Sequence, residues 1–415
     1  MDGEYELILK HLRFPIDKKI IDKNLPVNDE DIIYTNNLSD GACFDIEYYR
    51  EKYLKDDDID PIKHYLTIGV ENGCNPNKDF DGDFYLKMYP VVKLKKYNPF
   101  IHFIIWGLYE GRLPKKLTLK EALNQNLKKS LKGKNDYLFL INDSNSELRQ
   151  HFDNEYISPF SLEKSKKVQK IKKDYCNNLG IPFYSFGVPD KSIICTEYLP
   201  FSFDKIKRTL EERDDIIDLK CDELNHTHYS KLDTHTNYKG GKLLAFQILK
   251  HIDSSFTRKY YENMFRYANM IEYELSHDLA TYGNWSYSFA EFTRLRHIID
   301  SSKDMSFQPK NLKNVSSEIP KEFATVNRSK SIWFKNPDSY SDLKALILCD
   351  STMIYLRDYL SFYFKDMFLY WDHGTFNRDI IDWYEPDIIL EVRIERFLGG
   401  LPTPDWIEDI LSKIE

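Results

Sequence analysis

The stretch ALILCDS, residues 345–351, joins an uninterrupted apolar run to a short polar end and decides the fold of the second part of the chain. An apolar run of this length predicts a strand that is buried on both faces. Residues 352–364 follow with apolar side chains at helical spacing, which predicts an amphipathic helix. A strand that leads directly into a helix places Ser351 at the carboxyl edge of a parallel sheet, where open α/β folds bind their ligands.

Further apolar runs alternate with helical patterns on either side of this stretch. Strands that alternate with helices indicate a parallel sheet covered on both faces, so we expect a three-layer α/β/α domain. The expected strands cover residues 137–141, 182–186, 345–348, 367–370 and 387–390, and the expected helices cover residues 162–179, 241–252, 260–275 and 352–364. Residues 304–336 fit neither pattern and are expected to form a long excursion.

An internal duplication marks the first part of the chain. Residues 44–76 carry FD-x-x-x-Y, then DP, HY, two glycines and a proline, and residues 80–114 repeat this order with NP and HF in place of DP and HY. A period of about 36 residues is typical of small helical repeats. We therefore predict an all-α repeat domain over residues 1–125 and a second domain over residues 126–415.

Two histidines occupy matching positions in the two copies. His64 and His102 each follow a predicted first helical turn that begins with proline, and each is flanked by an aromatic residue. A histidine that recurs with a repeat among aromatic neighbours favours core packing over ligand binding. We expect both side chains to pack inside their repeats.

Composition narrows the classes of partner. The 415 residues carry a net charge of -8, which argues against nucleic acid, and the lysine-rich residues 164–173 fit a solvated helix face. No stretch approaches the ~20 apolar residues of a membrane span, and residues 1–14 lack the features of a signal peptide. Six scattered cysteines without C-x-x-C spacing favour a reducing compartment. We expect a cytoplasmic protein, with the inner face of the membrane as a second possible location.

A second polar segment, KLDTHTNYKGG at residues 231–241, supplies a partner for the serine. In an extended segment, residues two apart point the same way, so Asp233 is expected to orient the His235 imidazole. A neutral imidazole held in one tautomer accepts the proton of a serine hydroxyl. The prediction is Ser351 as nucleophile, His235 as base and Asp233 as the orienting carboxylate. Taken alone, each motif also fits a plainer role, since Ser351 suits a helix cap and His235 suits a surface loop.

Two alternatives for the site stay open. Ser144 also follows an apolar run and precedes the Asp-x-His segment, which makes it a second candidate nucleophile. A metal site is the other alternative, because His-x-His spacing with carboxylates suits zinc or manganese. Its ligands would come from Asp222, Glu223, His226, His228, Asp233 and His235. The spacing matches no metalloenzyme signature, so we expect no resident metal.

Together, these motifs resemble the SGNH-like domain of the alginate O-acetyltransferase (AlgJ/AlgX) family, in which a D-x-H-W segment precedes a GDS-like serine motif. Four further segments match that family in order, at residues 133–140, 188–200, 277–279 and 386–398. The resemblance covers about residues 131–400. Cys349 stands where the family has the glycine of GDS, and Thr236 stands where it has tryptophan. The repeats at residues 44–114 resemble those found beside polysaccharide-assembly glycosyltransferases.

The resemblance implies an SGNH-like fold and an O-acetyltransferase that acts on a bacterial cell-surface polysaccharide through an acyl-enzyme. It carries the three roles onto Ser351, His235 and Asp233. With no export signal, acetyl-CoA is the expected donor, and the repeats are expected to contact glycan-assembly enzymes. A carbohydrate acetyl-esterase with the same triad and a non-catalytic glycan-binding protein are the alternatives.

The remaining candidate residues are polar or aromatic. Asn237 and Cys349 are candidates for the oxyanion site, and Arg396 is a candidate for binding a sugar or a carboxylate. Asn237 and Arg396 also suit capping and ion-pair roles. Aromatic side chains stack on sugar faces or fill cores. The candidates for stacking are Tyr282, Trp285, Tyr287 and Trp371.

Overall fold

A computed structural model describes most of the chain. The described residues are 2–9, 40–55, 58–108, 110, 112–123, 130–141, 143–219, 221–274, 278–279, 303–323, 331–372 and 374–413. The backbone forms two compact units, one built mainly from residues up to Ala122 and the other mainly from the residues after it. The predicted boundary at residue 125 lies outside the described residues and stays a prediction.

A seven-stranded sheet forms the centre of the second unit. Its order is β4-β3-β11-β9-β10-β8-β7; the first five strands run parallel, and β8 and β7 each pair antiparallel with their neighbours. The strands are β3 (Phe183–Val188), β4 (Ile217–Asp218), β7 (Lys313–Asn314), β8 (Ile332–Lys335), β9 (Ser341–Cys349), β10 (Phe364–Trp371) and β11 (Ile388–Ile394).

Strand β9 lies at the centre of this sheet and contains the apolar run. Ala345 and Ile347 pack into one core, and Leu346 and Leu348 pack into another, with at most 2% of any of these side chains exposed. This alternation is the two-residue period of a strand, and both of its faces are apolar because both are covered. The apolar run therefore forms the buried strand that its composition predicts.

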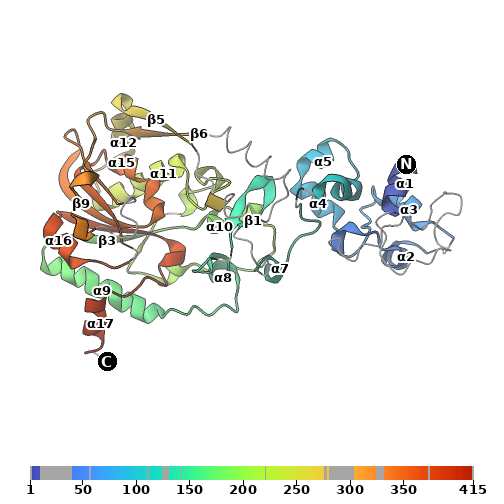
Figure 1. Ribbon diagram of the computed structural model, residues 1–415, viewed down its shortest axis with the longest axis horizontal. Coiled ribbons are helices and arrows are strands. Elements are labelled where there is room, and N and C mark those ends of the chain that lie inside the picture. The colour runs from blue at the N-terminus through green and yellow to red at the C-terminus, as the bar shows by residue number, and fades with distance from the viewer. Residues whose placement is uncertain are drawn as a thin grey trace. The chain divides into compact units, whose positions relative to one another are not determined.

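Helices cover both faces of the sheet (Figure 1). One face packs against α11 (Tyr238–Ile252), α12 (Arg258–Met264) and α15 (Arg357–Leu360). The other packs against α9 (Leu162–Asn178) and α16 (Arg378–Tyr384), and α17 (Asp405–Leu411) packs on α9. The predicted three-layer α/β/α class with a mostly parallel sheet is confirmed.

Two predicted elements differ in the structure. The run at residues 137–141 gives β2 (Leu138–Leu140), which pairs with β1 (Ser130–Lys132) outside the main sheet. The helix expected over residues 260–275 ends at Met264, and β5 (Asn269–Glu274) follows and pairs with β6 (Lys303–Gln308). In both cases the observed strand depends on pairing with another segment, β1 for β2 and β6 for β5. The local sequence pattern does not reveal these partners.

The helix expected over residues 352–364 is also broken. Ser351–Ile354 form a 3-10 turn, α15 is four residues long, and β10 begins at residue 364. The turn packs tightly on α11, because a Cβ added at Gly241 would lie 2.1 Å from the Tyr355 carbonyl oxygen. Only a glycine allows the backbones to approach this closely.

The first unit contains the two repeats, and each is built from short helices. Copy one has α2 (Ile46–Tyr53) and α3 (Pro61–His64), and copy two has α4 (Gly82–Met88), α5 (Pro90–Leu94) and α6 (Pro99–His102). A π-helical turn follows in each copy, at Tyr65–Gly69 and Phe103–Gly107. The described part of the first unit also contains α1 (Asp2–Leu9) and α7 (Leu119–Leu123). Two short helices of the second unit are α8 (Glu147–Phe152) and α10 (Lys191–Ile194).

Equivalent side chains make equivalent contacts in the two copies. The Tyr49 hydroxyl lies 2.9 Å from His64 Nδ1, and the Tyr85 hydroxyl lies 3.0 Å from His102 Nδ1. His102 is buried, as the repeat pattern predicts for both histidines, whereas His64 is half-buried. The duplication in the sequence is therefore a duplication of packing. Within the described residues, no helix has both the length and the apolar character needed to cross a bilayer.

Candidate active site

The segment at residues 233–235 forms a tight turn that brings Asp233 onto His235. One carboxylate oxygen of Asp233 accepts hydrogen bonds from the His235 backbone N–H, at 2.9 Å, and from its ring Nδ1–H, at 2.5 Å. Asp233 is fully buried, and the His235 side chain is 13% exposed. The sequence predicts this contact through an extended segment, but a turn stabilised by the aspartate makes it instead.

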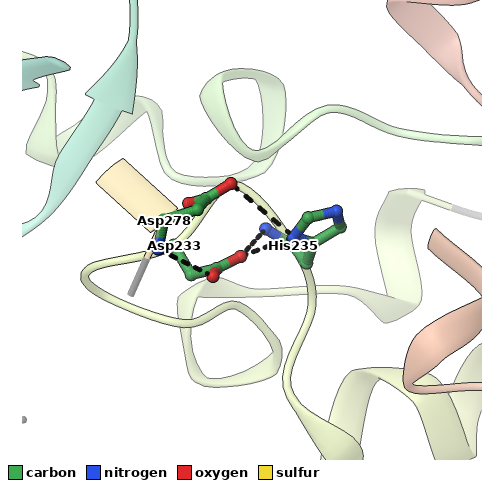
Figure 2. A group of neighbouring side chains, drawn as sticks. All are labelled: Asp233, His235 and Asp278. Atoms are coloured by element: carbon green, nitrogen blue, oxygen red, sulfur yellow. Dashed lines mark hydrogen bonds and ion pairs between the residues drawn. The ribbon is translucent and has the colours of Figure 1, made fainter. Parts of the chain in front are cut away.

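A second carboxylate, Asp278, completes a cluster around the imidazole (Figure 2). Its backbone N–H donates to Asp233 at 3.1 Å, and one of its oxygens lies 4.0 Å from His235 Nδ1. Its carboxylate accepts from the Thr234 backbone N–H at 2.9 Å and from the Thr234 hydroxyl at 2.8 Å. These bonds hold all three residues of the turn in one geometry.

The two carboxylates determine the charge preference of His235. Burial lowers the pKa of His235, but the hydrogen bond and charge of Asp233 and the charge of Asp278 outweigh it, so the pKa lies above its ordinary value. Burial and the neighbouring Asp233 raise the pKa of Asp278. The cluster therefore favours an imidazolium, the form that a general base takes after it accepts a proton.

The other ring nitrogen of His235 points away from both carboxylates (Figure 2). This atom, Nε2, is buried and has no hydrogen-bond partner among the described residues. His235 and Ser351 line the same cavity, which has a volume of about 530 Å³, and no hydrogen bond joins them. A buried, unsatisfied polar atom is costly in free energy, and such atoms gather at functional sites.

Three neighbouring strands direct residues into this cavity. Ser351 follows β9, Trp371 ends β10 and Arg396 follows β11. Asp350 holds the backbone beside Ser351 at the end of β9, because its carboxylate accepts hydrogen bonds from the Thr352 N–H at 2.8 Å and from the Ile394 N–H at 2.9 Å. The carboxyl edge of the sheet therefore forms one wall of the cavity, as expected for a ligand site in an open α/β sheet.

Two arginines line the cavity in different electrostatic settings. Arg396 is buried and paired, since its guanidinium binds Asp190 and lies 3.4 Å from Glu147. Arg357 lies with its Nε 3.8 Å from Asp358, whose carboxyl has a pKa raised by burial. The Arg396 charge is therefore largely compensated, and Arg357 is the second cation on the cavity wall.

Three residues singled out from the sequence are not brought to the cavity. Asn237 caps α11, where its amide oxygen accepts from the Gly240 N–H at 3.1 Å and its NH2 group donates to the Thr227 carbonyl at 2.7 Å. Cys349 packs into the core beneath α11. Ser144 is exposed and does not line the cavity. Tyr282, Trp285 and Tyr287 lie outside the described residues, whereas Trp371 lines the cavity.

The side chains considered for a metal separate in the structure. Within the described ranges, one group of three metal-type side chains has donor atoms within 4.8 Å of one another, namely Asp233, His235 and Asp278. His226 instead lies 3.1 Å from Glu197, and His228 accepts from the backbone N–H of Asn225 at 3.1 Å. Because His235 Nδ1 already binds Asp233, Nε2 is the ring nitrogen left for a ligand.

Sequence reasoning missed two contributors to this site. Asp278 appears in the family-like segment at residues 277–279, but nothing near it indicates contact with a residue 45 positions earlier. Arg357 lies six residues after Ser351, where a regular helix would direct it to another face. The broken helix turns it toward the cavity.

No family model matches this chain, and no curated protein matches it in sequence. Among solved structures, it is similar to Bacillus cereus PatB1 with a sulfonyl adduct, at 14% identity and a TM-score of 0.44, over 66% of this chain and 100% of that one. It is also similar to the O-acetyltransferase domain of Pseudomonas putida AlgJ, at 12% identity and a TM-score of 0.40, over 68% and 99%. A third similar structure is Pseudomonas aeruginosa AlgX, at 12% identity and a TM-score of 0.37, over 68% of this chain and 66% of that one. These values are too low to assign an activity, so the functional argument rests on the residues of the cavity.

Proposed function

We propose that this chain is a serine-dependent O-acetyltransferase that transfers an acetyl group to hydroxyls of a bacterial cell-surface polysaccharide. One observation carries the proposal. Asp233 binds one nitrogen of the His235 ring, the other nitrogen is buried without a hydrogen-bond partner among the described residues, and His235 lines the same cavity as Ser351. A weak hydroxyl nucleophile needs a base that is held in one tautomer and faces the hydroxyl.

In the first step the serine takes the acetyl group. The Ser351 oxygen attacks the acetyl carbonyl carbon as its proton passes to His235 Nε2. The bond between that carbon and the donor's leaving atom breaks, and the leaving group takes the proton from His235. Asp233 and Asp278 stabilise the imidazolium that forms in between.

In the second step the acyl-enzyme is consumed. The acceptor hydroxyl attacks the ester carbon and gives its proton to His235 Nε2, and the ester bond to Ser351 breaks as the serine oxygen regains that proton. The products are an acetylated sugar and the free enzyme. The same residues hydrolyse the intermediate when water attacks, which is the esterase alternative.

Other features support the choice of acceptor and donor. The cavity residues fall within the range of about residues 131–400 that resembles the alginate O-acetyltransferase family. The duplicated repeats resemble modules found beside glycan-assembly enzymes. We propose acetyl-CoA as donor, a cytoplasmic location and glycan-assembly enzymes as partners of the repeats. Trp371 offers an aromatic surface in the cavity on which a sugar ring can stack.

A transfer assay with labelled acetyl-CoA and a purified capsular or exopolysaccharide tests this proposal. We expect label to move to the polysaccharide with wild type and with Ser144→Ala, whose altered serine is exposed, and not with Ser351→Ala. Release of acetate from acetylated glycan without any transfer would identify an esterase. Glycan binding without either reaction, unchanged in Ser351→Ala and His235→Gln, would identify a binding protein.

A further inference from the structure

Lys191 is a buried cation close to the Asp233–His235 turn. It is the first residue of α10 and is 2% exposed. Its ammonium group donates to three backbone carbonyls: to Leu138 at 2.7 Å, to Lys231 at 2.8 Å and to Asp233 at 2.9 Å. All three N–H donors of the ammonium are therefore used.

These three carbonyls belong to the segments that support the site. Leu138 begins β2, and its own N–H donates to the Lys231 carbonyl at 2.8 Å. Lys231 and Asp233 lie at the start of the turn whose aspartate binds His235. Lys191 thus joins α10, β2 and the turn, and one of its bonds goes to the residue that orients the imidazole.

Among the described residues, no carboxylate forms an ion pair with this buried cation. Within the described ranges its partners are the three neutral carbonyls and two aromatic rings, Tyr137 and Phe139, whose centres lie 5.4 and 5.5 Å from the ammonium nitrogen. A buried charge without a paired carboxylate is costly in free energy. The hydrogen bonds from the ammonium group to the three carbonyls offset part of this cost and connect Lys191 to the turn.

We propose that Lys191 is a positioning residue of the candidate active site, whose ammonium group holds the Asp233–His235 turn in the geometry that the reaction requires. The expected effect of Lys191 on the rate rests on the proposed function. The expected effect of Lys191 on the hydrogen bond between Asp233 and His235 does not depend on that function. Loss of the ammonium lowers kcat rather than raising KM, because Lys191 does not line the cavity.

The ammonium also titrates near neutral pH. Burial lowers the pKa of Lys191 to about 8. The ionisable groups around it favour the charged form, namely the Cys195 thiol and the carboxylates of Asp233, Asp278 and Glu147. Above this pKa the group has two N–H donors instead of three, so one carbonyl loses its bond. The rate is expected to fall on the alkaline side, whereas protonation of His235 lowers it on the acid side.

The test measures the rate of Ser351-dependent acylation by p-nitrophenyl acetate across pH in wild type, Lys191→Met and Lys191→Arg. We expect Lys191→Met to lose about 10- to 100-fold in kcat with KM nearly unchanged. Lys191→Arg is expected to restore part of the rate and to move the alkaline limb upward, since a guanidinium keeps its proton. Lys231→Met is the matched control, because the Lys231 side chain is exposed and lies over the same Tyr137 ring.

A second readout separates this inference from the proposed function. The His235 ring proton that is bonded to Asp233 gives a low-field NMR signal, which is expected in wild type, Lys191→Arg and Lys231→Met and lost in Lys191→Met. If wild type is not acylated, the proposed function is contradicted. The role of Lys191 is then tested by the NMR signal alone, compared between wild type and Lys191→Met. An unchanged signal in Lys191→Met, or identical pH profiles in wild type and Lys191→Arg, would overturn the role of Lys191.

Discussion

His102 in the second repeat and His235 in the α/β unit are both largely buried and both use Nδ1 for a hydrogen bond. The partner of His102 is the Tyr85 hydroxyl at 3.0 Å, and the partner of His235 is the Asp233 carboxylate at 2.5 Å. The environment of the opposite ring edge also differs. His102 packs against the rings of Tyr97 and Trp106, whereas the second ring nitrogen of His235 is buried without a hydrogen-bond partner among the described residues, in a side chain that lines the cavity.

The pKa values follow the partners. Burial, with the nearby Arg112, lowers the pKa of His102 to about 4, so this ring stays neutral. Burial acts in the same direction on His235, but the carboxylates of Asp233 and Asp278 reverse the shift. Burial alone therefore does not distinguish a packing histidine from a candidate base. The charge of the partner and the environment of the second nitrogen distinguish them.

Exchanging each histidine for glutamine gives the largest contrast. His235→Gln removes the proposed base and is expected to lower kcat for acetyl transfer about 10³-fold. His102→Gln is expected to leave kcat within about twofold, because that ring packs within a repeat. Steady-state rates on one acceptor compare the two variants. Equal losses in both would remove the distinction between the two sites.

Changing the partner of His235 is expected to have the next largest effect. Asp233→Asn keeps the shape of the turn but removes the negative charge that raises the pKa of His235. The rate is expected to fall about 100-fold. The acid limb of the pH profile should also move to lower pH, since the neutral base then persists in more acidic solution. An acid limb that stays in place in Asp233→Asn would show that another group causes it.

The opposite pKa shifts give opposite stability effects in acid. The pKa of His102 is lowered from 6.5 to about 4, so the unfolded chain binds this proton more readily between those values. Stability from this residue is complete above pH 6.5 and is lost as the pH falls toward 4. The hydrogen-exchange protection of peptides spanning residues 99–107, taken relative to the intrinsic exchange rate at each pH, should fall over this range in wild type. His102→Phe should not show this pH dependence, and its persistence there would contradict the assignment.

A glycine in the repeats provides the smallest expected change in activity. A Cβ at Gly107 would lie 2.2 Å from the Tyr85 hydroxyl, so Gly107→Ala displaces the hydrogen-bond partner of His102. We expect a loss of about 1–3 kcal/mol in the free energy of unfolding, measured by denaturant titration. Acylation of Ser351 should be unchanged. A variant as stable as wild type would show that the repeat adapts at this position.

The sequence predicted the fold class and the contact between Asp233 and His235 for identifiable reasons. The apolar run before Ser351 is buried on both faces, and Asp233 and His235 are close enough in sequence for a local argument to join them. Asp278 and Lys191 reach the turn from distant segments, and their sequences do not reveal those contacts. Asn237 is a candidate for the oxyanion site from the sequence, but it caps α11 and does not line the cavity.

The central claim is that Ser351 carries the acetyl group. Intact-mass measurement after brief incubation with acetyl-CoA or an activated acetyl ester tests it most directly, with peptide mapping to locate the adduct. We predict one added acetyl group on Ser351 in wild type and in Ser144→Ala, and none in Ser351→Ala. An adduct that disappears in Ser144→Ala and persists in Ser351→Ala would contradict the account.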